Sequence, residues 1–449
     1  AVAIQLPAVR GDTSGAHGRM IRELSSAGDE LLQQPKSRAF FGAKIDLDLF
    51  IHLFCFLSVL LIGADRWGVE LFGVNFRVDQ LFLCFFALLL AVKGEYRLTC
   101  NLWVIAFVGF SLLSTVFSVS LTRGILFFCS IVYNVLFLFY AFASYVKYYG
   151  LERFLSVFRA TMFVQFFILL LQFALKLATG YEFPFLPSYG EYMGIYRFQL
   201  WFYEPSYLAT YLTVWFTLAF MQFLLNGKKN YLWDIFAALV MFLISTSTSG
   251  FLAIALVVGV VYLIWLFRGV TAKKLAFPVI LLVLFAAAAI AFLSMFEVFL
   301  GRLFDSSLDE ASGGRIAGWT ETWQVFLENV FFGVGPGNYG LYLGQDAGYV
   351  PTNVSLELLA TLGIGGFVAF YGLTAALAVQ AFVLYRRRQT EQTFLLFSFA
   401  LALLFFTVIL QINQGYLRLY HWMMFGILWG AIGREREEEC PESMEDTNE

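Results

Sequence analysis

Arginines and glutamates gather in two polar stretches of an otherwise apolar chain. One stretch carries Arg197 and then Glu204, and the other, over residues 297–366, carries Arg302 and Arg315 among many glycines. A guanidinium group binds a phosphate through paired hydrogen bonds, and a carboxylate can take a proton from a reacting hydroxyl. These residue types therefore predict chemistry on a phosphate-bearing substrate, with arginines binding the phosphate and a carboxylate acting as the base.

Each candidate base also has a structural interpretation. Glu204 stands directly before a proline, which favours the first position of a helix, so its carboxylate could cap that helix instead of facing a substrate cavity. Glu357 is the second candidate for the base, or it could instead orient Asn353 or Arg315 inside the protein. Aromatic residues around Glu204, Tyr203 among them, suit stacking on sugar rings, but a membrane-interface belt is the better interpretation for most of them.

The glycine-rich part of the second stretch is predicted to form turns. Residues 335–340 match the pattern G-x-G-x-x-G, but a proline interrupts them and no strand is expected before them, so we reject a dinucleotide site. Arg315 follows two glycines, which let a backbone approach a ligand closely. The alternative for Arg315 is a salt bridge to Asp305, Asp309 or Glu310.

The composition is that of a membrane protein. Of 449 residues, 60% are hydrophobic and only 14% are charged, whereas about 25% are charged in soluble chains. The mean hydropathy is +0.75, and apolar runs of roughly 20 residues recur. Backbone groups in a bilayer must be hydrogen-bonded within the protein, so we expect an all-α, polytopic bundle. The five cysteines have no paired spacing, and we expect no disulfide framework, metal or cofactor.

The apolar runs predict about twelve transmembrane helices. Residues 1–44 should be a poorly ordered cytoplasmic segment, residues 45–433 the bundle, and residues 434–449 an acidic cytoplasmic tail. The twelve runs lie at about 47–64, 76–92, 102–119, 124–145, 157–178, 205–225, 231–246, 251–267, 275–296, within 353–385, 393–411 and 420–433.

The distribution of cations predicts the orientation of these helices. With both termini in the cytoplasm, cytoplasmic segments hold 21 of the 29 lysines and arginines, and loops 179–204 and 297–352 lie outside. Seven of the other 8 cations are arginines, which suits a phosphate-bearing ligand. Three of them could instead be interfacial anchors or pair with Asp65, Asp79 or Glu70; these are Arg66, Arg77 and Arg123.

In this order, the motifs resemble those of a known family. Arg197 precedes Ser-Thr-Ser-Gly at 247–250, Gly-Arg at 314–315, the turn at 333–339, and Asn353-x-x-x-Glu357 with a following Leu-Gly-Ile-Gly-Gly. Over roughly residues 190–370, the chain resembles the O-antigen ligase/polymerase superfamily of bacterial envelope glycosyltransferases.

The resemblance implies a reaction and a location. Such enzymes work at the outer, periplasmic face of the bacterial inner membrane on glycans linked to undecaprenyl pyrophosphate. They transfer the glycan to an acceptor hydroxyl without a nucleotide sugar or a metal. Arg197 and Arg315 would bind the pyrophosphate, with Arg302 nearby, and Glu204 or, second, Glu357 would be the base. The bilayer, the lipid-linked oligosaccharide and a chain-length regulator are the expected partners, and nucleic acid is not.

One departure from the family favours a polymerase. Ligases of this family carry histidine before the asparagine that matches Asn353, and this chain has Thr352 there. The three histidines lie elsewhere, at 17, 52 and 421. We therefore expect a polymerase that joins lipid-linked repeat units of O-antigen, capsule or exopolysaccharide. The alternatives are a ligase that moves the glycan to lipid A-core or protein, and a transporter with about twelve spans, for which inverted repeats and broken helices would be expected.

Overall fold

The computed structural model describes residues 46–71, 74–183, 185–192, 195–271, 274–276, 315–346 and 348–439. The chain divides into two compact units, Ala1–Asp48 and Leu49–Glu449, and the elements discussed below lie almost entirely in the second. The predicted N-terminal segment 1–44, Arg302, and nearly all of the predicted span at 275–296 lie outside the described residues.

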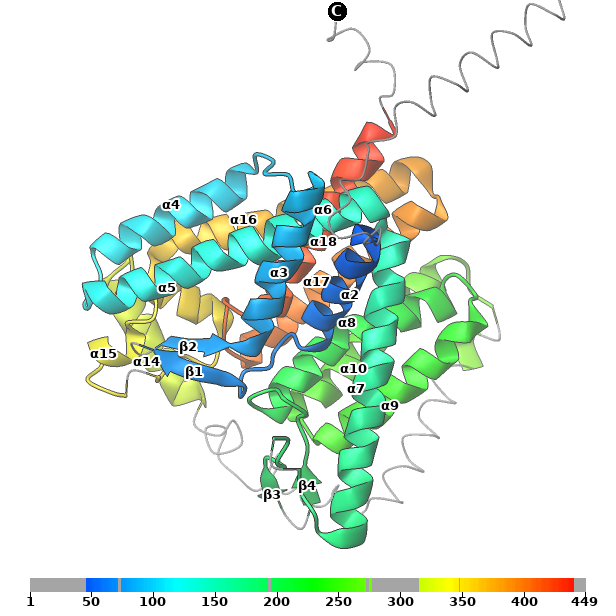
Figure 1. The fold of residues 1–449 in the computed structure, drawn as a ribbon, viewed down its shortest axis with the longest axis horizontal. Coiled ribbons are helices and arrows are strands. Elements are labelled where there is room, and N and C mark those ends of the chain that lie inside the picture. The colour runs from blue at the N-terminus through cyan, green and yellow to red at the C-terminus, as the bar shows by residue number, and fades with distance from the viewer. Residues whose placement is uncertain are drawn as a thin grey trace, which may run out of the picture. The chain divides into compact units, whose positions relative to one another are not determined.

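Helices dominate the described part of the chain, as the composition predicts (Figure 1). The helices are α2 (Leu47–Leu60), α3 (Val78–Lys93), α4 (Leu102–Val116), α5 (Leu121–Tyr133), the π-helix η1 (Asn134–Tyr140), α6 (Ala141–Tyr149), α7 (Leu151–Thr179), α8 (Pro205–Leu224), the 3₁₀ turn η2 (Lys229–Tyr231), α9 (Leu232–Ser245), α10 (Thr248–Phe267), α14 (Arg315–Glu328), α15 (Tyr339–Tyr342), α16 (Val354–Arg388), α17 (Glu391–Ile409), the 3₁₀ turn η3 (Leu410–Ile412) and α18 (Leu419–Glu437).

Two short antiparallel hairpins were not predicted. Strands β1 (Gly68–Leu71) and β2 (Val74–Arg77) pair between α2 and α3. Strands β3 (Gly190–Tyr192) and β4 (Ile195–Arg197) pair in the loop before α8. Each strand has only three or four residues, which are too few for an alternation of apolar and polar residues to distinguish a strand from a loop.

Six of the described helical segments are long and apolar enough to cross a membrane. They span Leu121–Tyr149, Leu151–Thr179, Pro205–Leu224, Thr248–Phe267, Val354–Arg388 and Glu391–Ile412. Helices α2 and α4 are apolar but shorter. Each predicted apolar run in the described ranges coincides with a helix, so a helical membrane bundle is confirmed, whereas the number twelve stays a prediction.

Contacts between helix ends agree with the predicted alternation. At one end, called here the cation-rich end, Lys147 pairs with Glu437 and Arg388 with Glu435, while other cations there include Lys228, Arg268 and Arg434. At the opposite end, the Arg418 guanidinium lies 3.0 Å from the Asp65 carboxylate. Since α16 and α18 connect these ends, predicted cytoplasmic and predicted outer segments lie at opposite ends of the same helices.

Helix α16 is broken at Gly363, where φ is +67°. Such a break leaves carbonyls without their helical N–H partners, and in a bilayer other protein groups must supply them. Here the N–H groups of Val334 and Gly335 donate to the carbonyls of Ala360 and Thr361, at 2.9 and 3.1 Å. The break is therefore filled by another part of the chain.

That part is the turn at residues 333–338, called here the glycine turn, and it confirms the predicted turn. Its three glycines all have positive φ, from +66° to +96°. Asn338 is fully buried and accepts a hydrogen bond from Ser120 N at 3.1 Å. Arg123 Nε donates to the carbonyl of Gly337 at 2.5 Å. The glycine turn is thus attached both to α16 and to the start of α5.

Candidate functional site

Glu204 lies at the N-cap position of α8, with Pro205 as the first helical residue. The position is the one that the sequence predicts for a helix cap, but the side chain makes no capping hydrogen bond to the helix backbone. Its carboxylate instead accepts a hydrogen bond from Ser206 Oγ at 3.0 Å, and the residue is only partly buried. A partly exposed carboxylate without backbone donors keeps the lone pairs that a general base needs.

Several charged and aromatic groups surround Glu204. Arg66 Nη2 donates to the carbonyl of Tyr203 at 3.3 Å, and the Arg197 guanidinium lies 5.3 Å from the centre of the Tyr189 ring. Desolvation, followed by the nearby Glu204 charge, raises the pKa of the Tyr189 phenol, and Arg66, Arg197 and Tyr203 also act on it. The predicted residues Arg197, Tyr203 and Glu204 therefore share one neighbourhood.

A network of ion pairs lies beneath this neighbourhood. The Asp65 carboxylate contacts both Arg77 and Arg418. Arg77 Nε also lies 3.4 Å from Asp79. The pairing of Arg77 with Asp65 and Asp79 confirms the structural alternative for this arginine. Its charge is already neutralised, so binding a substrate phosphate would require breaking partly buried pairs.

Arg418 connects this network to α8. Its guanidinium lies 3.5 Å from the centre of the Tyr207 ring, close enough for a cation–π interaction. Gln414 donates a hydrogen bond to the Tyr207 hydroxyl at 2.7 Å. Because Tyr207 is in the first turn of α8, these contacts fix the helix end that bears Glu204.

Glu357 occupies the first turn of α16 and is 7% exposed. Its Oε2 accepts a hydrogen bond from Gly415 N at 2.7 Å, and its charge interacts with Arg418. The carboxylate therefore holds the loop between α17 and α18. This is a structural role, although the partner is that loop and not Asn353 or Arg315.

The start of α16 is capped by Asn353. Its Oδ1 accepts from Leu356 N at 3.0 Å, and its Nδ2 donates to the carbonyl of Gln411 at 2.8 Å. Thr352, directly before it, is partly buried. Asn353 thus supports the position of Glu357 one turn later, as a side-chain cap does in general.

The structure leaves the role of Arg315 untested. Arg315 is the first residue of α14 and is partly exposed, and α14 packs against α16. Figure 1 shows α14 and β4, which ends at Arg197, in separate parts of the molecule. The possible partners Asp305, Asp309 and Glu310 lie outside the described residues. A site that combines Arg197 and Arg315 therefore stays a prediction.

Asp65, Tyr207, Gln414 and Arg418 were not predicted as site residues. Arg418 is one of the 8 cations, called here the outer cations, that the predicted orientation places outside the cytoplasmic segments. The sequence signal that could have indicated these residues is the short run Gln411–Tyr416. This run carries several polar residues and separates two apolar runs.

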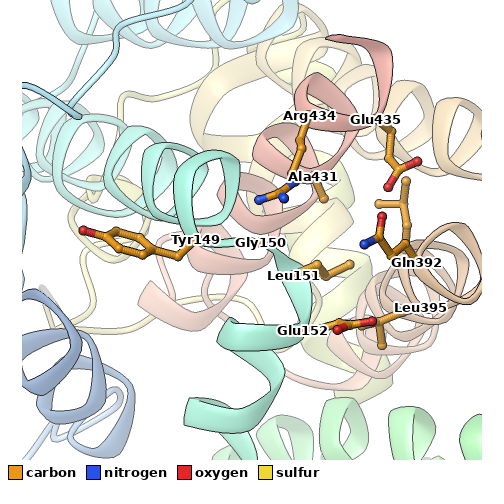
Figure 2. A pocket seen from close by; sticks show the side chains of 10 residues that line it. Tyr149, Gly150, Leu151, Glu152, Gln392, Leu395, Ala431, Arg434 and Glu435 are labelled. Carbon is orange, nitrogen blue, oxygen red and sulfur yellow. The ribbon is translucent and has the colours of Figure 1, made fainter. Parts of the chain in front are cut away.

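A cavity of about 110 Å³ lies at the cation-rich end (Figure 2). Its lining comes from the corner between α6 and α7 and from α17 and α18, and includes Gly150, Gln392, Arg434 and Glu435. None of the predicted site residues in the described ranges lines it. The cavity is thus separate from the neighbourhood of Glu204.

Comparison with known proteins agrees with the motifs. A family model described as O-Antigen ligase matches residues 235–371, a range that includes Arg302, Arg315, Asn353 and Glu357. The teichuronic acid biosynthesis protein TuaE of Bacillus subtilis (strain 168) is 22% identical over 362 residues, covering 75% of this chain and 72% of TuaE. The apolar helices are those of a multi-pass membrane protein. The two matches support an O-antigen ligase/polymerase-like family for the chain, as the sequence motifs predict.

Proposed function

We propose that the protein is a polysaccharide polymerase of the bacterial inner membrane. It transfers a glycan from undecaprenyl pyrophosphate to a hydroxyl of another lipid-linked repeat unit at the periplasmic face. The observation that carries this proposal is the gathering of Arg66, Arg197, Tyr203 and Glu204 at the helix ends opposite the cation-rich end. By the positive-inside rule, the cation-rich end faces the cytoplasm, so the helix ends that bear these four residues face away from it.

The proposed reaction exchanges one bond for another. The bond between the anomeric carbon of the donor sugar and the pyrophosphate oxygen breaks, and the same carbon bonds to the acceptor oxygen. The hydroxyl proton passes to Glu204, and undecaprenyl pyrophosphate leaves with the electron pair on its phosphate oxygen. Arg197 would stabilise the charge that develops on this leaving group. Arg315 and Arg302 of the central stretch stay predicted pyrophosphate-binding residues.

Glu204 is a better base than Glu357 because their surroundings differ. The carboxylate of Glu357 is almost fully buried and holds a backbone N–H of the loop before α18. Taking a proton would weaken that contact. Glu204 is bonded only to a neighbouring serine hydroxyl among its described hydrogen bonds, and it is partly exposed.

Two rival functions have specific support. The description of the matching family model favours a ligase, whereas Thr352 in place of the ligase histidine favours a polymerase. The break at Gly363 is a feature expected of a transporter. However, the glycine turn fills this break with backbone hydrogen bonds, so its freed carbonyls do not face a substrate path.

The deciding experiment uses purified protein and the lipid-linked repeat unit isolated from a strain that lacks the gene. Incubation with this substrate alone should give a ladder of lengths and release undecaprenyl pyrophosphate. Product that forms only after a second acceptor such as lipid A-core is added would identify a ligase. If neither reaction occurs but proteoliposomes take up the lipid-linked unit, the enzyme proposal is wrong. A ladder whose lengths change when a chain-length regulator is added would identify that partner.

A further inference from the structure

Two exposed tyrosines lie beside Glu204. Tyr189 is 43% exposed and Tyr203 is 55% exposed. Tyr203 precedes Glu204 directly, and Tyr189 interacts electrostatically with Glu204. These two rings are called here the tyrosine pair, and both belong to the neighbourhood of the carboxylate that we propose as the base.

The ring of Tyr203 is supported from below. It stacks against Tyr207 with the ring centres 6.4 Å apart and 26° between the planes. Tyr207 in turn lies against the guanidinium of Arg418, which pairs with Asp65. Arg66 holds the Tyr203 backbone through its carbonyl. An exposed ring held in this way loses little conformational freedom when a ligand binds, which favours affinity.

Tyr189 is held from the other side. Its backbone N–H donates to the carbonyl of Arg197 at 2.8 Å, and the Arg197 guanidinium lies against its ring. The tyrosine pair therefore combines apolar ring faces with hydroxyl, guanidinium and carboxylate groups at the edges. A sugar has the matching arrangement, with C–H groups on its faces and hydroxyls around its rim, and ligand sites commonly combine apolar surface with a few placed polar groups.

We propose that Tyr189 and Tyr203 bind the acceptor sugar and hold its hydroxyl next to Glu204. This inference rests on the proposed transferase function and names the place of the acceptor within it. An acyl chain is a poorer occupant, because the charged groups of Arg66, Arg197 and Glu204 would lie against it and lose hydration.

A membrane-interface belt is the rival explanation, and the chain supplies matched controls for it. Tyr181 and Phe185 are exposed aromatic residues of the same loop, at 53% and 76%, but neither has a described contact with Glu204. A belt would use all four rings in the same way. An acceptor site requires only the tyrosine pair.

The test measures transfer to a lipid-free oligosaccharide of the repeat unit, at a fixed concentration of the lipid-linked donor. Y203A should raise KM for this acceptor about tenfold and Y189A should act in the same direction, while kcat and KM for the donor change little. Y203F should restore the wild-type KM, because the ring face is retained. Y181A and F185A should match the wild type. An unchanged acceptor KM in Y203A, or equal effects of all four alanine variants, would overturn the inference.

Binding of the same oligosaccharide, measured by calorimetry without donor, separates the two proposals. If the wild type forms no product but binds the oligosaccharide and Y203A does not, the transferase proposal fails and the sugar site stands. If the wild type forms product and Y203A binds and reacts like it, the sugar site fails and the transferase proposal stands. Absence of both binding and product in the wild type would refute both.

Discussion

Replacement of Gly363 by alanine should destabilise the protein through the break in α16. The residue has φ of +67° and ψ of −171°, a conformation that is essentially restricted to glycine and costs an L-residue about 1–3 kcal/mol. A Cβ atom there would lie 2.3 Å from the carbonyl oxygen of Phe331 and 2.5 Å from its carbonyl carbon. Both atoms belong to the backbone, so a rotamer change cannot relieve the contact and the chain itself must move.

The movement would strain the hydrogen bonds that fill the break. Val334 donates to Ala360, and Ile364 on the far side of the break donates to Val330, each at 2.9 Å. Gly335 donates to Thr361 at 3.1 Å. Each such bond contributes about 0.5–1.5 kcal/mol. Losing two of them together with the conformational cost gives a decrease in the free energy of unfolding of roughly 2–6 kcal/mol.

Gly94 provides the matched control. It ends α3 with φ of +81°, yet an added Cβ would meet no atom within 4 Å. G94A should therefore lose only the conformational cost of about 1–2 kcal/mol. Unfolding of each purified variant in mixed micelles, titrated with SDS and followed by tryptophan fluorescence, measures the difference. Equal losses for G363A and G94A would show that the Phe331 backbone yields easily and would refute the reasoning.

Three further predictions concern the charged residues. Arg197→Ala and Arg315→Ala should each abolish polymer on a polysaccharide gel while immunoblots show normal amounts of protein in the membrane; full-length polymer in both would discard the pyrophosphate role. Glu204→Gln should lower the transfer rate about 10²–10⁴-fold, whereas wild-type turnover would leave Glu204 as part of the helix start only. Arg159→Ala should lower the free energy of unfolding by about 3 kcal/mol, because it leaves the fully buried Asp234 without its bidentate partner at 2.6 and 2.8 Å; a loss below about 1 kcal/mol in the SDS titration would contradict this.

The helices were predictable because a chain that crosses a bilayer needs long apolar runs. A helix is one of the few structures that pair every backbone N–H and C=O group of such a run within the protein. The start of α8 at Pro205 also follows from the sequence, since proline fits the first helical position. The break at Gly363 did not follow. Its Leu-Gly-Ile-Gly-Gly sequence reads as the interior of an apolar helix, and the hydrogen bonds that make the break stable come from the glycine turn, which lies in a different segment of the chain.

The helix position of Glu204 was predictable, but the arrangement of the charged residues around it was not. Glu204 stands at a helix start, as the proline after it indicates. The pairing of Asp65 with Arg418 joins residues that are 353 positions apart, and only the packing of the helices brings them together. No local pattern records such a pair, so an arginine that could bind phosphate and one that neutralises a buried carboxylate look alike in the sequence.

The ion pairs of the outer cations bear on which of these cations could bind a phosphate. Among the outer cations, Arg77 and Arg418 pair with Asp65, and Lys176 pairs with Glu182 at 2.8 Å. A phosphate would have to displace a carboxylate from each of these, and the cost of separating a partly buried pair opposes that exchange. Arg197 contacts the exposed Tyr189 ring beside Glu204, where developing charge on a leaving group and a proton acceptor would meet. An activity lost in R197A but retained in R77K would therefore locate the leaving group at the hairpin of β3 and β4, above the ion-pair network.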